Sequence, residues 1–196
     1  MSLTNRQRSF IARIAAKEGT LGFISALHDI SPFDPYDFSW FALKPARLGN
    51  MLCHTSDSRA VTPLQLYFRY TEKGYKLYIR SRSYHRKTIS RKDGYLGAFE
   101  ADSDSDAELF HVDSEALSAI PLEQAINPND WYSFNLISAI TKKPISRRVR
   151  NLDTHAGKDR QSKAYTCITA DGGAPLPLRM QILQTNAPYL DHPDEV

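Results

Sequence analysis

Cysteine is scarce in this chain, which has only Cys53 and Cys167 among its 196 residues. Two cysteines so far apart exclude the disulfide framework of a small secreted domain and the zinc sites built from cysteine clusters. The six histidines do not cluster with cysteines or with closely spaced carboxylates. We therefore expect two buried thiols rather than a disulfide, and neither a metal nor another cofactor.

Long apolar runs are missing too. No run approaches the roughly 18 residues that a membrane-spanning helix needs, so no transmembrane segment is expected. The first residues hold no continuous apolar core before a small-residue cleavage site, and we expect no classical signal peptide. The predicted location is cytoplasmic, and export without a cleaved signal stays open. Hydrophobic residues make up 41% of the chain, which favours one soluble folded domain over a disordered chain.

Signatures of catalysis are absent as well. The chain has no glycine-rich phosphate-binding loop and no Gly-x-Ser-x-Gly nucleophile elbow. Carboxylates, histidines and serines are plentiful, but their spacing selects no pair of nucleophile and base. The sequence therefore favours a protein without enzymatic activity.

A pattern that occurs three times is what the chain does contain. In each occurrence an apolar segment leads to a turn aspartate, and a second apolar segment follows eight or nine residues later. A pair of apolar residues with period-two spacing precedes each occurrence, as in a half-buried strand. Such near-constant spacing indicates an internal structural repeat. The preceding pairs are Phe41 and Leu43, Leu77 and Ile79, and Phe134 and Leu136; the first segments are 51–55, 95–99 and 165–169; the aspartates are Asp57, Asp102 and Asp171; the second segments contain Leu66, Phe110 and Met180.

Two segments of the middle repeat carry a resemblance to a known family. Residues 94–97 (Gly-Tyr-Leu-Gly) and 109–112 (Leu-Phe-His-Val) resemble the fascin-like branch of the β-trefoil superfamily. The resemblance covers residues 39–184 and implies an all-β fold, a β-trefoil of three four-stranded units. The Gln-x-Trp signature of ricin-type trefoil lectins is absent, and an antiparallel β-protein without threefold symmetry is the alternative. The units are expected at about 39–70, 73–113 and 131–184.

The two ends of the chain are expected to lie outside the repeats. Residues 4–30 are predicted to be helical, because Thr4 and Gln7 fit a capping box and an apolar helix face follows them. A proline-rich linker ends near residue 38, and we expect residues 1–38 to pack on the barrel. Residues 185–196 are expected to form a flexible tail. The apolar helix face consists of Phe10, Ile11, Ile14 and Ala15, with Gly19 as the left-handed cap.

Basic residues concentrate in two predicted loops, the first loop of the second unit and the corresponding loop of the third. In a trefoil, pseudo-threefold symmetry would place both loops at one end of the barrel, where their fields add and attract phosphate or sulfate. Tyr84 and His85 lie in the first loop, where their rings can stack on a sugar or a base. A flexible, solvated loop is the alternative. The basic residues are Arg80, Arg82, Arg86 and Lys87 in one loop, and Lys142, Lys143, Arg147, Arg148 and Arg150 in the other.

The turn aspartates Asp57, Asp102 and Asp171 form a second candidate surface. Many trefoil lectins hold a sugar at such turns, and a carboxylate accepts hydrogen bonds from vicinal hydroxyls. Aspartate is also a common turn former, so a purely structural role explains the same residues.

These observations favour a non-catalytic binding module with lectin-like recognition of a glycan, especially an acidic or sulfated one. Two alternatives stay open. One is binding of nucleic acid or another phosphate polyanion through the basic loops, and the other is a toxin-type or effector-type protein that binds a host protein. The oligomeric state is not predicted, and because a fold hosts many functions, the choice among these ligands rests on analogy.

Overall fold

The computed structural model describes residues 4–27, 49–57, 61–100, 108–118, 122, 130–156 and 159–188. Strands dominate these residues, so the fold is all-β. Among the described helices, none is long and apolar enough to cross a membrane. The short helical segments are α1 (Asn5–Arg8), α2 (Ile24–Leu27), the 3₁₀ turn η1 (Arg82–Tyr84) and α4 (Glu115–Ser118).

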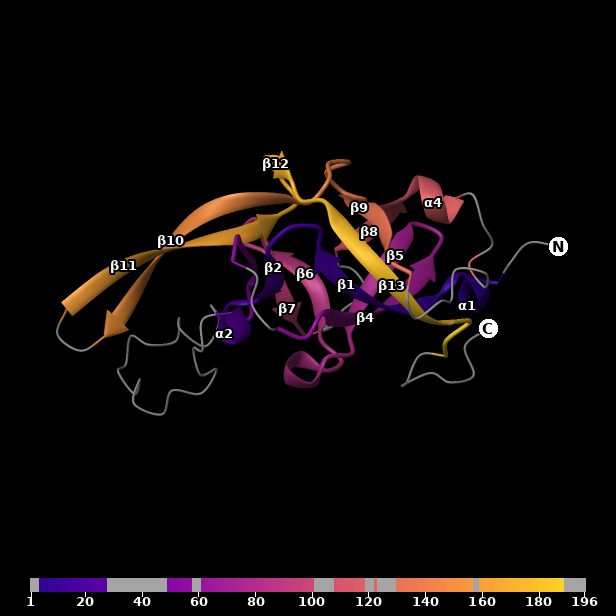
Figure 1. The fold of residues 1–196 in the computed structure, drawn as a ribbon, viewed down its shortest axis with the longest axis horizontal. Helices are drawn as coiled ribbons and strands as arrows, with labels where there is room; N and C mark the ends of the chain where they lie inside the picture. Colours follow the sequence, from indigo (N-terminus) through magenta and orange to yellow (C-terminus); the bar gives the residue numbers. More distant parts are fainter. Residues whose placement is uncertain are drawn as a thin grey trace.

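A closed barrel of six strands forms the body of the molecule (Figure 1). Each strand pairs antiparallel with two neighbours, in the ring order β1, β4, β5, β8, β9, β13 and back to β1. Closure pairs both edges of every strand, which leaves the ring no free edge. The strands are β1 (Phe10–Ala16), β4 (Leu64–Thr71), β5 (Gly74–Ile79), β8 (Leu109–Asp113), β9 (Tyr132–Ser138) and β13 (Leu178–Thr185).

Three hairpins connect consecutive barrel strands. Neighbouring barrel strands run in opposite directions, so the carboxyl ends of β1, β5 and β9 lie at the same end of the barrel, and all three hairpins start there. The hairpins touch one another through the pairs Cys53 with Cys167 and Thr169 with Tyr95. The hairpins are β2 (Thr20–Phe23) with β3 (Leu52–Thr55), β6 (Thr88–Lys92) with β7 (Tyr95–Phe99), and β10 (Ser146–Ala156) with β11 (Asp159–Thr169); β12 (Ala174–Pro175) pairs with the start of β10.

Alternate residues of the barrel strands fill its interior. Leu77 and Ile79 on β5 are fully buried, as the period-two spacing of these residues predicts. Phe10 and Phe68, on the paired strands β1 and β4, stack with ring centroids 4.5 Å apart. Every barrel strand contributes to this core, which includes Phe10, Ala12, Ile14, Leu66, Phe68, Leu77, Ile79, Phe110, Phe134, Leu136, Leu178 and Met180.

The predicted helix over residues 4–30 is confirmed at α1 and α2 and is wrong between them, where β1 and β2 lie. The capping box between Thr4 and Gln7 is present, but the helix ends at Arg8. Residues 10–16 form β1 instead, because β4 and β13 pair with both of its edges. These tertiary hydrogen bonds, with Ala12 and Ala16 buried in the barrel, outweigh the helix propensity of an alanine-rich segment. Gly19, predicted as a helix cap, has φ +70° and lies in the turn between β1 and β2.

The apolar segments predicted as strands do lie in strands, but the basic segments between them are not simply loops. Leu77 and Phe134 belong to β5 and β9, whereas Phe41 and Leu43 lie outside the described residues. Arg147, Arg148 and Arg150 belong to the strand β10. The sequence prediction missed this strand because its consecutive charges hide any alternation of apolar and polar residues.

Candidate functional site

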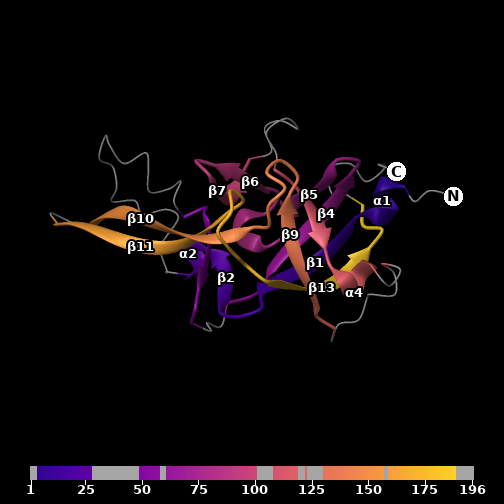
Figure 2. The ribbon, with the colours of Figure 1, turned by 90° about the horizontal axis from the view of Figure 1, so that it is seen from above.

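The hairpin of β10 and β11, residues 146–169, is here called the arm. Its two strands pair without interruption from Ser146 with Thr169 to Ala156 with Asp159. Among the described residues, the outer edge of β10 pairs with β12 at Ser146 and Arg147. Figures 1 and 2 show the arm projecting from the barrel as a two-stranded ribbon. Neither strand of the arm belongs to the barrel ring.

Exposed arginines occupy the base of the arm on β10. Arg147, Arg148 and Val149 are exposed, and Val149 has 65% of its surface accessible. Lys142 and Lys143, also exposed, lie in the turn that leads from β9 to β10. We call Lys142, Lys143, Arg147 and Arg148 the basic surface. Four exposed cations within seven residues of chain produce a positive field next to an exposed apolar side chain.

Arg150 is held by the protein and does not belong to the basic surface. Its guanidinium lies 4.5 Å from the centre of the Tyr95 ring, a cation–π contact with β7. Its Nη1 also donates to the Sδ of Met51, at 3.5 Å. Arg150 therefore fixes the base of the arm against the other two hairpins.

The second basic cluster, between β5 and β6, is only partly available to a ligand. Arg82, His85 and Arg86 are exposed, and Arg80 is half-buried. Lys87 forms an ion pair of 2.9 Å with Glu100. The exposed arginine and histidine side chains of this segment are accessible to an anion. They lie in or next to η1, which is a different element from the arm.

Tyr84 is buried, so its ring is not available to stack on a ligand as predicted. Its hydroxyl donates to the carbonyl oxygen of Gly49 at 3.1 Å and lies 2.8 Å from the hydroxyl of Ser25. The ring contacts Phe23 edge to face, with centroids 4.6 Å apart. Tyr84 is therefore a packing residue of the core.

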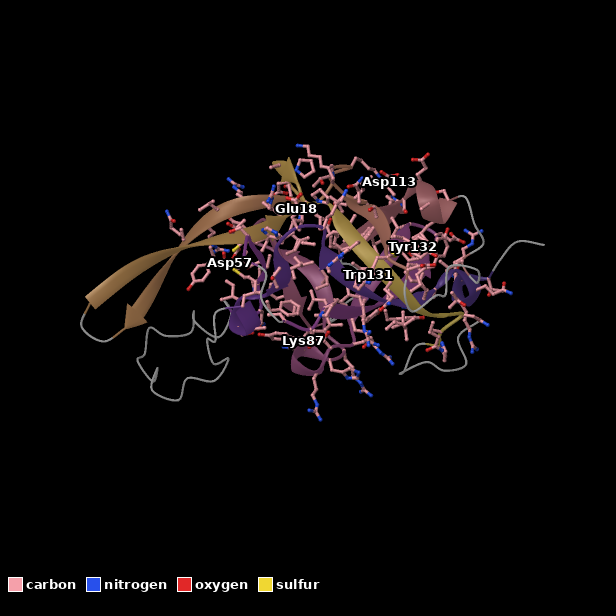
Figure 3. The ribbon with its side chains drawn as sticks, in the orientation of Figure 1. Glu18, Asp57, Lys87, Asp113, Trp131 and Tyr132 are labelled. Atoms are coloured by element: carbon pink, nitrogen blue, oxygen red, sulfur yellow. The ribbon has the colours of Figure 1, made fainter. Side chains whose placement is uncertain are left out.

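The two basic clusters start at the same end of the barrel but do not form one surface. Figure 3 places Lys87 on the lower side of the body in that view, whereas the arm leaves from the upper side. The carboxyl ends of β5 and β9 share the hairpin end, yet the connections that follow them diverge around the barrel. Their fields therefore act on different sides of the molecule.

The turn aspartate Asp171 is engaged in an ion-pair network. Its carboxylate accepts a hydrogen bond of 2.7 Å from Nη1 of Arg91. The Nε of Arg91 lies 3.4 Å from the carboxylate of Glu108, which is buried and also accepts from the hydroxyl of Ser138. Lys143 donates to the backbone oxygen of Asp171 at 3.2 Å. A sugar hydroxyl would have to compete with these partners.

The other two turn aspartates differ from Asp171. Asp57 is exposed (Figure 3), and its backbone oxygen accepts from the hydroxyls of Thr20 and Thr55 at 2.8 and 3.2 Å, which is a turn-forming role. Asp102 lies outside the described residues. The imidazole of His54, three residues before Asp57, is buried, and its Nε2 lies 2.8 Å from the backbone oxygen of Glu18. The described turns therefore do not present matching pairs of a free carboxylate and a free ring.

Among the described residues, no three histidine, cysteine, aspartate or glutamate side chains lie close enough to hold a metal ion. No family model, curated protein or solved structure matches this chain.

Proposed function

We propose that this chain is a β-trefoil of three units, each supplying two barrel strands and one hairpin. The ring order of the six barrel strands supports this assignment, because each unit contributes adjacent strands and its hairpin rises from the same end as the others. In this assignment the first unit begins at β1, about thirty residues before the start predicted from sequence. The units are then β1 to β4, β5 to β8, and β9 to β13.

The proposed function is non-catalytic binding of an acidic polymer, a sulfated glycan, through the basic surface. The observation that carries it is the exposure of Arg147 and Arg148 on a projecting ribbon, beside Lys142 and Lys143. Guanidinium groups bind sulfate with paired, charge-assisted hydrogen bonds, and a ribbon that stands away from the barrel lets an extended chain approach from the side. Recognition through the turn aspartates has less support, because Arg91 already pairs with Asp171.

Nucleic acid is the second candidate, and the shape of the arm favours it. A two-stranded β-ribbon fits the major groove of duplex DNA, and arginines on such a ribbon reach phosphates on both sides of the groove. The same four basic residues would then contact phosphate instead of sulfate.

Heparin chromatography with a charge-matched control tests the proposal. The double variant Arg147→Glu with Arg148→Glu should elute at a clearly lower salt concentration than the unchanged protein. The control, Lys17→Glu with Lys73→Glu, reverses two other exposed lysines and alters the net charge equally, so it should elute close to the unchanged protein. Equal losses in both variants would show that only net charge matters and would overturn the assigned surface.

A competition experiment on the heparin column distinguishes the two ligand classes. Sulfated heparin should displace the protein from a heparin column. Desulfated heparin should not displace it, and neither should a duplex oligonucleotide that carries the same total charge as the sulfated heparin. Displacement by the duplex alone, with binding that falls steeply as salt rises, would replace the glycan with nucleic acid.

A further inference from the structure

Cys53 and Cys167 lie directly opposite each other where the hairpin of the first unit meets the arm. They are cross-strand partners on β3 and β11, although 114 residues separate them in sequence. Both side chains are fully buried, both are free thiols, and their sulfur atoms are 3.0 Å apart. This is the single register pair that joins β3 to β11.

The pair lies in a small apolar cluster separate from the barrel core. The other buried members are Ile24, Leu27, Met51 and Tyr165. Arg150 lies at the edge of this cluster, bonded to Met51 and stacked on Tyr95. A nearby cation favours the thiolate, whereas the apolar surrounding opposes it.

The hydrogen bond between the sulfurs makes the two thiols unequal. The thiol of Cys53 donates to the sulfur of Cys167, and this bond lowers the pKa of Cys167 against the opposing effect of burial, with a further lowering by the charge of Arg150. The same hydrogen bond, together with burial, raises the pKa of Cys53. Cys167 is therefore the thiol that loses its proton first, and Cys53 keeps its own.

We propose that Cys53 and Cys167 form a redox-active pair that a peroxide oxidises to a cross-strand disulfide, which ties the base of the arm to β3. Directly opposite residues of an antiparallel pair have Cα atoms about 4.5–5.5 Å apart, within the range that a disulfide spans. Rotation of the side chains is enough to bring the sulfurs into bonding contact. A peroxide suits the site because it is small and uncharged and both sulfurs are buried.

The oxidation proceeds in two balanced steps. The Cys167 thiolate attacks one peroxide oxygen, the O–O bond breaks, and the departing hydroxide takes up the proton that the thiol released, which leaves water and a sulfenic acid on Cys167. The sulfur of Cys53 then attacks the sulfur of Cys167, the S–O bond breaks, and the hydroxyl leaves as water with the proton of Cys53. Two thiols lose two electrons and two protons, and one peroxide is reduced to two waters.

The disulfide would change the stability of the whole chain, independently of any ligand of the arm. It would close a loop of more than 100 residues and restrict the unfolded chain accordingly. For a protein of this size the midpoint of thermal unfolding should rise by roughly 10 °C.

Mass spectrometry of the full chain after peroxide treatment tests the proposal. The reduced protein is treated with dilute hydrogen peroxide, denatured, and alkylated with N-ethylmaleimide. The expected result is a product that carries no maleimide and has lost two hydrogen atoms, with a raised unfolding midpoint, both reversed by dithiothreitol. Two maleimide additions after treatment, or irreversible addition of three oxygens to either cysteine, would overturn it.

Single variants test which sulfur attacks first. In Cys53→Ser the remaining Cys167 should form a sulfenic acid that a dimedone probe traps, whereas in Cys167→Ser the remaining Cys53 should react at least roughly 10-fold more slowly. Equal rates in the two variants would overturn the assigned order of attack. The mass measurement on the unchanged protein needs neither variant, so it decides the proposal even if a serine in the buried cluster prevents folding.

Discussion

Arg91 connects three separate parts of the fold. It lies on β6, and its guanidinium pairs with Glu108 at the start of β8 and with Asp171 after β11. Glu108 is only 1% exposed, and Arg91 and the hydroxyl of Ser138 contact its carboxylate. Asp171, which the sequence marks as a possible glycan site, is therefore paired with an arginine of the protein itself.

Replacing Arg91 by methionine should destabilise the protein by about 3 kcal/mol, because it leaves the Glu108 carboxylate buried without its cation. The matched control is Lys87→Met, which breaks the ion pair with Glu100. Glu100 is 65% exposed, so this change should cost less than about 1 kcal/mol. Urea unfolding measures both, and similar losses in the two variants would contradict the buried role of Glu108. Adding Glu108→Gln to Arg91→Met should restore part of the loss.

At the scale of the element, β1 closes the barrel because it pairs with both β4 and β13. Its apolar residues satisfy both a helical period and a strand period, since Phe10, Ile11 and Ile14 suit a helix face while Phe10, Ala12 and Ile14 suit one side of a strand. In the structure Ala12 is fully buried between β4 and β13, whereas Ala15 is half-buried. A strand buries Ala12 and a helix would bury Ala15, so the burial of these two alanines distinguishes the two structures.

Ala12→Glu should prevent cooperative folding, because a carboxylate inside the barrel costs several kcal/mol with no partner. Ala15→Glu should fold and lose roughly 1 kcal/mol at most, as for a partly exposed position. Circular dichroism during thermal unfolding distinguishes them. If Ala12→Glu unfolds like the unchanged protein while Ala15→Glu fails to fold, the helical prediction for residues 10–16 is right after all.

At the scale of the whole molecule, we expect the stability of the barrel to be independent of the outer part of the arm. The core draws on all six barrel strands, and Asn151 and Ala164, where the outer part of the arm begins and ends, are exposed. The outer part of the arm is a two-stranded ribbon, which is marginal alone; within the described part of the chain, strand pairing supports the arm where its base meets the other hairpins.

Shortening the arm should therefore leave the barrel intact. Arg150 and Tyr165 are cross-strand partners, so residues 151–164 can be replaced by an Asn-Gly turn between them. The midpoint of thermal unfolding should stay within roughly 5 °C of the full chain. A cooperative transition that disappears on this replacement would show that the outer arm holds the barrel together.

Local patterns in the sequence predicted much of the strand content but little of the site. The period-two residues Leu77 and Ile79 mark β5, and the capping box at Thr4 marks α1, because each depends only on near neighbours. Arg148 gave no comparable signal of β10, since consecutive charges carry no alternation. The charges of Arg91 and Glu108 gave no signal of their pairing, because it depends on how β6 and β8 are brought together.

The sequence by itself determined that the chain is β-rich, that its basic residues concentrate in two segments, and that it has only two cysteines. Only the tertiary structure decided that residues 10–16 form a strand, that Arg150 contacts Tyr95 and Met51 while Arg147 and Arg148 are exposed, and that Cys53 meets Cys167. The physical reason is that barrel closure pairs strands distant in sequence. The hydrogen bonds and burial gained there outweigh the small preferences that local sequence expresses.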